Sequence, residues 1–243
     1  MSTKPSLLQN SVLEEDEGTR RSLRDVAYDL IKQRITTCAY KPGEYLNEAL
    51  VSASLGIGRT PVHQAIDRLK VEGLVEVMPR KGIIVKPISL DEVMQIIEVR
   101  LLNECYGVRL AATRASQGEI DQLASVLARS KDGMASRDNE MMMTLDREFH
   151  GILAQASRND VLGEQLGRLH DRSLRFWIIS LNAPGHLQEV YDEHLAILTA
   201  ILDRDADAAE QAMRLHIEGF QRNIMGSAAT GQPMPTWNEG SAK

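Results

Sequence analysis

The chain has 243 residues, a formal net charge of −6, 43% apolar residues and 4% aromatic residues. The apolar content suffices for a core, while the shortage of Tyr, Phe and Trp argues against a β-rich fold. The apolar stretches are short and interrupted by charges, which excludes a membrane span, and the first ten residues lack the pattern of a secretory signal. Two distant cysteines, Cys38 and Cys105, lack metal-ligand spacing, so we expect free thiols in a reducing cytoplasm.

The charge is unevenly distributed. Between Arg21 and Lys86 there are eleven Lys and Arg against seven Asp and Glu, a net charge of +4, so the rest of the chain carries −10. This asymmetry indicates a basic DNA-binding head on an acidic body.

Four segments follow from composition and periodicity. Residues 1–20 are predicted to be a disordered arm, and residues 226–243 a flexible tail rich in Gly, Pro and Ser. Residues 21–87 are predicted to form a DNA-binding domain. Residues 88–225 are predicted to form an all-helical domain.

In the first domain, helix and turn signals alternate quickly. A first helix with Ile31 and Ile35 on its apolar face ends before the turn Lys41-Pro42-Gly43. A short helix near 48–55 is followed by a longer one from Thr60 to about Glu72. Two β-prone segments, 74–78 and 83–86, then flank a turn. This order predicts a winged helix-turn-helix.

In such a domain the second helix of the motif enters the major groove and the wing reaches phosphates. Arg59 and Thr60 lie at the amino end of that helix, where they can meet phosphate or base edges. Sequence-independent attraction is expected from Arg68, Lys70, Arg80, Lys81 and Lys86. The alternative interpretation is a small helical domain that mediates protein contacts.

Helical periodicity continues through the second domain. The predicted helices lie near 89–114, 117–135, 139–157, 160–182, 187–203 and 205–224. The pairs Ser89/Glu92 and Ser116/Glu119 have capping-box spacing, which supports the first two starts. The fold class is therefore mainly α, a winged helix-turn-helix followed by an all-α bundle of six helices.

Four polar residues lie on faces of these helices that should point into the bundle. Asp146 and His150 are four residues apart on one helix, and His194 and His216 lie on the apolar stripes of two others. Buried imidazoles need partners, and one metal ion satisfies several together. The alternative is that each histidine forms its own local hydrogen bonds.

The amino-terminal motifs resemble the winged helix of the GntR family of bacterial regulators. The resemblance covers about Ser22 to Lys86 and rests on Leu46-Asn47-Glu48, Leu55-Gly56-Ile57-Gly58-Arg59-Thr60-Pro61-Val62, Glu72-Gly73-Leu74-Val75 and Arg80-Lys81-Gly82-Ile83-Ile84-Val85. It implies a double-stranded DNA operator as partner.

This chain departs from the family where arginines commonly contact DNA. Relatives commonly have Arg where it has Ala49, Arg-Glu where it has His63-Gln64, and often Arg where it has Asp67, and the usual Ser is Gly58. His63 and Gln64 can still donate to base edges. We expect a changed operator preference and a smaller salt dependence.

Residues from about Ser89 to Met225 resemble the FCD ligand-binding domain of the FadR branch, most closely the VanR-like subgroup. The motifs are Asp146-Arg147-Glu148-Phe149-His150, Glu193-His194, Met213 with His216, and Glu98-Val99-Arg100 with Glu104. The resemblance implies that Asp146, His150, His194 and His216 bind a divalent metal. Zn²⁺ or Ni²⁺ suits three imidazoles and one carboxylate, and Mn²⁺ or Fe²⁺ is also compatible.

The resemblance also implies a small organic acid as effector, held at open metal positions. Arg100 is a second clamp for its carboxylate, or alternatively an ion-pair partner of Glu104 one turn away. The expected effector-binding residues are Arg100, Glu104 and Asn103, and Asn103, where relatives often have Leu, is expected to alter the pocket.

The predicted function is a homodimeric repressor whose operator affinity depends on the bound acid. Two alternatives remain: a regulator for which the metal is the signal, and, with less support, a metal-dependent hydrolase. No catalytic residue is predicted, because no motif places an acid or base beside the four polar residues.

Overall fold

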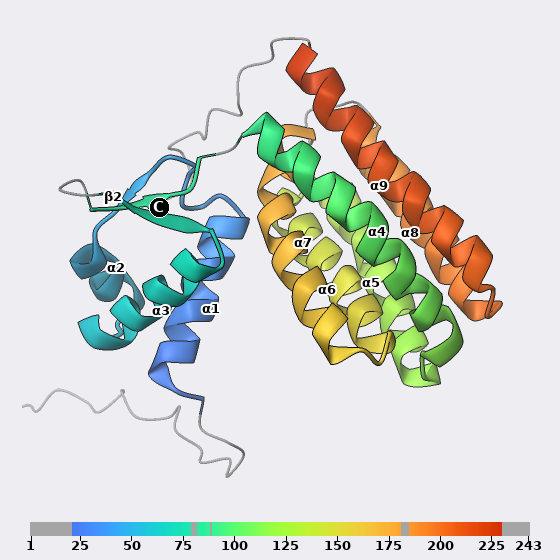
Figure 1. The fold of residues 1–243 in the computed structure, drawn as a ribbon, viewed down its shortest axis with the longest axis horizontal. Coiled ribbons are helices and arrows are strands. Elements are labelled where there is room, and N and C mark those ends of the chain that lie inside the picture. Colours follow the sequence, from blue (N-terminus) through green and yellow to red (C-terminus); the bar gives the residue numbers. More distant parts are fainter. Residues whose placement is uncertain (1–20, 79–81, 88, 181–184, 230–243) are drawn as a thin grey trace, which may run out of the picture.

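The computed structural model describes residues 21–78, 82–87, 89–180 and 185–229 of the chain (Figure 1). Two predicted DNA contacts, Arg80 and Lys81, lie outside the described residues, as do the predicted arm 1–20 and residues 230–243 of the predicted tail. The first residues of that tail are helical, since the last helix continues to Ala229.

A small mixed domain comes first. Its helices are α1 (Leu23–Thr36), α2 (Glu48–Leu55) and α3 (Arg59–Val71), and its strands are β1 (Tyr45–Leu46), β2 (Val75–Met78) and β3 (Gly82–Val85). The strands form an antiparallel sheet in the order β1-β3-β2. The sequence predicted β2 and β3 as the wing, but not β1, because two residues are too few to show an alternating pattern.

Local capping explains where α2 and α3 begin and end. The side chain of Asn47 accepts hydrogen bonds from the backbone N–H groups of Ala49 and Leu50 and so starts α2. Gly56 ends it in the left-handed conformation at φ +64°, which a residue with a Cβ adopts only with strain. Gly58 precedes α3 and has no side chain to cap it.

Six helices follow in the described part of the chain: α4 (Leu90–Arg114), α5 (Gln117–Ser136), α6 (Asn139–Ala156), α7 (Asp160–Ser180), α8 (His186–Leu202) and α9 (Ala206–Ala229). They pack as one bundle around a continuous apolar core (Figure 1). The predicted fold class, a winged helix-turn-helix followed by an all-α bundle, is confirmed. None of the described helices is long and apolar enough to cross a membrane.

The head packs against the bundle where α1 lies beside α7. At this junction Lys32 of α1 lies between two carboxylates: its Nζ is 3.0 Å from Glu72 Oε2 of α3 and also contacts Asp171 of α7. All three side chains are buried. A buried, paired lysine therefore joins the carboxyl end of α3 to a helix of the bundle.

Candidate metal centre and DNA-binding face

The four residues expected to bind a metal come together inside the bundle. Asp146 and His150 lie on α6, His194 on α8 and His216 on α9, and all four are buried. Each offers one ligand atom, and these four atoms lie within 4.8 Å of one another. The spacing predicted from each helix separately is thus realised by the packing of three helices.

Carboxylates orient two of the imidazoles. His150 Nδ1 lies 2.9 Å from Glu104 Oε2, and His216 Nδ1 lies 2.9 Å from Glu193 Oε2. A proton on each Nδ1 leaves a lone pair on each Nε2, and these two Nε2 atoms face each other at 3.2 Å. Two facing lone pairs repel unless a cation lies between them.

The remaining two ligands, His194 and Asp146, also lie close together. His194 Nε2 has no hydrogen-bond partner among the described residues, although it is buried and lies 3.5 Å from Asp146 Oδ1. Two ligands that are each about 2.0–2.1 Å from one ion are separated by roughly 3.0–3.4 Å. The observed separations of 3.2 and 3.5 Å therefore suit one shared divalent ion.

Electrostatics keeps the cluster in its ligating protonation states. Burial lowers the pKa of His194 well below its usual value and that of His216 to about 3, so both imidazoles are neutral. Burial alone would raise the pKa of Asp146, but the nearby imidazoles of His170, His150 and His194 hold it below its usual value. A neutral imidazole and an ionised carboxylate are the forms that bind metal.

A close approach of α8 and α9 positions Glu193. A Cβ at Gly219 of α9 would collide with Glu193 Oε1, so this carboxylate keeps its present position beside His216 only while residue 219 has no side chain. Burial raises the pKa of Glu193 to about 7. Nothing in the spacing of the sequence showed this role, because Glu193 acts on a residue of another helix.

His170 of α7 is a further member of the site. Its Nε2 lies 3.3 Å from Asp146 Oδ2, and its ring stacks on that of His150 at 4.6 Å. The sequence contains a signal for this position, because the apolar residues Leu166, Leu174 and Trp177 lie on the same helix face as His170. All three are buried in the structure. That pattern places His170 inside the bundle.

Arg100 is buried beside the cluster and contacts Glu104 through Nε, while its Nη1 lies 3.3 Å from Ser173 Oγ. Glu104 therefore links Arg100 to His150. A small cavity of about 10 Å³ is bordered by Arg100, Asp146 and His216 among others. Such a volume holds about one water molecule.

The third residue expected at the effector pocket, Asn103, does not reach it. Its side-chain amide donates a 2.8 Å hydrogen bond to the carbonyl of Val99, and it borders none of the described cavities. One residue before Glu104 on a helix means a rotation of about 100°, which turns Asn103 away from the bundle interior.

On the head, α3 exposes the residues predicted to contact DNA. Arg59, Thr60, His63, Gln64 and Lys70 are exposed, whereas Val62, Ala65, Ile66 and Leu69 pack into the core. The first turn of the helix lacks an acidic residue. Its amino end therefore offers free N–H groups and positive charge on a surface open to a duplex.

Two of the predicted basic contacts already have partners. The guanidinium of Arg68 lies 3.6 Å from the centre of the Tyr28 ring, and its Nε lies 3.4 Å from Glu72 Oε1. Lys86 Nζ lies 3.0 Å from Glu92 Oε2. Both side chains thus stabilise the protein itself, and any part in binding DNA is additional.

His63 also has acidic neighbours. Its Nδ1 lies 2.9 Å from Glu48 Oε1 and its Nε2 lies 3.5 Å from Asp67 Oδ2. The hydrogen bond and charge of Glu48, with the charge of Asp67, raise the pKa of His63 above its usual value. Where relatives commonly carry arginines, this chain therefore has an imidazole whose charge depends on pH.

Comparison with known proteins supports both halves of this description. The family model "Bacterial regulatory proteins, gntR family" matches residues 23–85, and "FCD domain" matches residues 95–219. The "Nta operon transcriptional regulator" of Aminobacter aminovorans is 30% identical, over 74% of this chain and 83% of that protein. The "HTH-type transcriptional repressor RspR" of Escherichia coli is 26% identical, over 81% and 86%.

Among solved structures, "E. coli McbR/YncC" has a TM-score of 0.78 at 21% identity, covering 88% of this chain and all of that one, so the two share a fold. The matching families consist of transcriptional regulators and not of enzymes, which removes the hydrolase alternative. The chain belongs to the GntR family of bacterial DNA-binding transcriptional regulators, with an FCD domain behind its winged helix.

Proposed function

We propose that this regulator is a repressor whose operator affinity is set by a small organic acid bound beside a divalent metal in the bundle. The observation that carries the proposal is the buried centre of Asp146, His150, His194 and His216. A cation between the facing Nε2 atoms of His150 and His216 would also give the orphaned His194 Nε2 a partner, which supports the proposal.

The donor set indicates which ion is held. Three imidazoles with one carboxylate favour Zn²⁺ or Ni²⁺, and Mn²⁺ or Fe²⁺ remain compatible. When bound, the ion supplies open coordination positions for an oxygen ligand and links α6, α8 and α9. Glu104 and Glu193 orient two of the ligating imidazoles.

Arg100 is the residue best placed to receive the carboxylate of the acid. It borders the small cavity together with Asp146 and His216, and its guanidinium can bind a carboxylate with two hydrogen bonds. Because that cavity has room for only about one water, an acid enters only if side chains around it move. Binding is therefore coupled to a change in the bundle, as a ligand-controlled switch requires.

The exposed face of α3 then contacts the operator, and we propose that the regulator binds it as a homodimer. One helix reads a short half-site, which gives too little specificity, whereas two heads read two half-sites at a fixed spacing. A change in the bundle alters the spacing of the heads. The Arg100 cavity beside the centre favours an acid over the ion alone as the signal.

A thermal-shift assay on metal-loaded protein tests the proposal. We expect one or more of acetate, lactate, glycolate and citrate to raise the melting temperature and to weaken binding to the gene's own upstream duplex. The variant His194→Ala should lose its metal and the response to acid, while His63→Ala, a histidine substitution on the head, should keep both. Metal retained by His194→Ala would refute the assigned ligands.

A further inference from the structure

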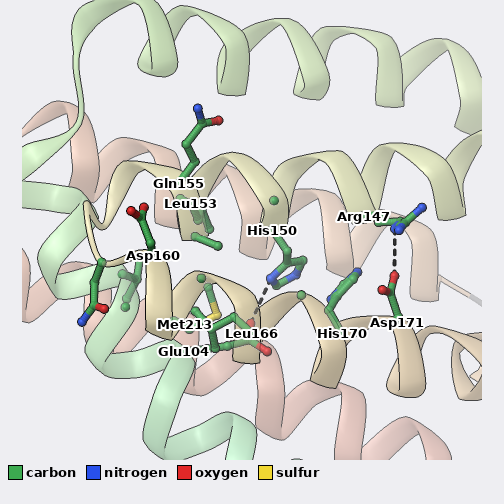
Figure 2. A pocket seen from close by; sticks show the side chains of 17 residues that line it. Glu104, Arg147, His150, Leu153, Gln155, Asp160, Leu166, His170, Asp171 and Met213 are labelled. Atoms are coloured by element: carbon green, nitrogen blue, oxygen red, sulfur yellow. Dashed lines mark ion pairs between the residues drawn. The ribbon is translucent and has the colours of Figure 1, made fainter. Parts of the chain in front are cut away.

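A second cavity is larger than the one beside Arg100. It has a volume of about 410 Å³ and lies between α6 and α7, with α4 and α9 contributing Glu104 and Met213 (Figure 2). This is within the range of small-molecule pockets, which are mostly apolar with a few polar groups. His150, His170 and Glu104 border it, while Asp146, His194 and His216 do not, so it lies behind the ligand cluster.

Two exposed glycines on facing helices border the cavity, Gly151 of α6 and Gly167 of α7. A Cβ added at either would meet nothing within 4 Å. Both lie in helix interiors, where glycine is less favourable than alanine. The apolar wall comes from Leu153, Leu166, Val108 and Met213.

A buried polar side chain faces this space without a hydrogen-bond partner. His170 is only 5% exposed, borders the cavity, and neither of its ring nitrogens has a hydrogen-bond partner among the described residues. Its Nε2 lies 3.3 Å from Asp146 Oδ2, whereas its Nδ1 has neither a hydrogen bond nor an ion-pair contact among the described residues. An unsatisfied buried nitrogen beside an apolar cavity indicates a polar group of a ligand.

The charges that border the cavity indicate which ligand charge is accepted. Glu104 is already paired with Arg100, and Asp171 with Lys32. The exposed carboxylate of Asp160 also borders the cavity, at the end opposite Arg147 (Figure 2). Arg147 lies at one end, as Figure 2 shows, and uses its Nε for Asp171 Oδ1 at 2.8 Å. Its two terminal nitrogens remain on the same planar group, which suits a carboxylate.

We propose that this cavity, which adjoins the metal centre at Glu104, His150 and His170, is a second small-molecule site, for a monocarboxylic acid with an apolar body. The carboxylate pairs with Arg147 and the apolar body fills the space over Gly151 and Gly167. Because Arg147 shares Asp171 with Lys32 of the head, the site lies at the junction of the two domains.

Titration calorimetry of the full-length, metal-loaded protein with octanoate, octan-1-ol and octylamine tests the site and its charge preference. We expect octanoate to bind most tightly and octylamine most weakly. Arg147→Gln should reduce octanoate affinity by about tenfold or more, towards that of octanol, and Arg147→Lys should retain part of it. Tighter binding of octylamine than of octanoate would overturn the proposal.

Cavity-filling variants locate the site. Gly151→Leu, on α6, and Gly167→Leu, on the facing wall, should each abolish octanoate binding. Gly118→Leu, another helical glycine with open space around it but outside the cavity, should leave it unchanged. Circular dichroism identifies a variant that does not fold. The octanoate affinity of the variant at the other glycine then decides between the outcomes. Unchanged octanoate affinity in a folded Gly151→Leu or Gly167→Leu protein would refute the site, whatever the metal centre binds.

Discussion

The head and the bundle place their functional residues in opposite environments. On α3 the candidate DNA contacts are exposed, share one helix and keep their local spacing in the fold. In the bundle, the candidate ligands are buried and come from three helices, with Glu104 on a fourth. An exposed helix face can change residues at little cost in stability, whereas each buried polar group depends on partners supplied by distant segments.

The junction combines both environments. Lys32 belongs to the head but is buried like a residue of the bundle, and it links Glu72 at the end of α3 to Asp171, the neighbour of His170. The Tyr28 hydroxyl donates to Glu72 at 2.7 Å, and Arg68 packs on the Tyr28 ring. This chain of contacts is the described physical connection between the metal-centre region and the recognition helix.

The largest effect is expected from breaking that connection. Lys32→Met removes the cation between two buried carboxylates, so we expect a loss of about 3–5 kcal/mol in the free energy of unfolding, measured by urea denaturation. Lys86→Met removes a less buried lysine that also pairs with a glutamate, and we expect a loss of at most about 1 kcal/mol. If both variants lost the same free energy of unfolding, the burial of Lys32 at the junction would not make its ion pairs more stabilising than that of Lys86.

A smaller effect is expected when one orienting carboxylate is displaced. Gly219→Ala places a methyl group against Glu193 Oε1, at the end of a flexible side chain, so this carboxylate must shift from its position beside His216. We expect metal affinity to fall by up to roughly tenfold, the low end of what losing a ligand-orienting carboxylate costs, measured by competition with a chromogenic chelator. Gly118→Ala, in open space on α5, is the matched control. An affinity equal to that of the unmodified protein would separate Glu193 from the metal centre.

On the head, the expected effects concern salt dependence. Lys70→Ala removes an exposed charge, so the slope of log affinity against log salt concentration should fall by about 1. Arg68→Ala should change that slope less and lower the melting temperature more, because Arg68 packs on Tyr28 and contacts Glu72. Fluorescence anisotropy with the upstream duplex at several salt concentrations measures the slopes. The reverse ranking would show that Arg68 is the phosphate contact.

The smallest effect is expected from His63. Glu48 and Asp67 raise the pKa of His63. The imidazole is therefore positively charged at pH values below this raised pKa and loses its charge as the pH rises through it. Affinity for a duplex should therefore increase as the pH falls from about 8 to about 6. The variant His63→Gln should show a flatter profile in the same anisotropy assay. Identical profiles would remove His63 from the interface.

Much of the fold was predictable from local pattern. The helix starts at Ser89 and Ser116, the turn at Gly56 and the alternation of short elements in the head follow from capping and periodicity, which act within a few residues. Strand β1 was missed because its two residues belong to a sheet only through pairing with β3. The end of α9 was placed too early, since the helix continues past the last residues with a clear period.

For the candidate site, the sequence by itself determined which residues can act: Asp146 and His150 share a helix face, and His194 and His216 lie on apolar stripes. Only the tertiary structure decided which residues contact these ligands, namely Glu104, Glu193 and His170. It also decided that Asn103 bonds to its own helix and that a cavity remains between α6 and α7. The physical reason is the distance along the chain over which each effect acts. Periodicity fixes the direction of a side chain around its own helix, whereas partners and cavities depend on how separate helices pack.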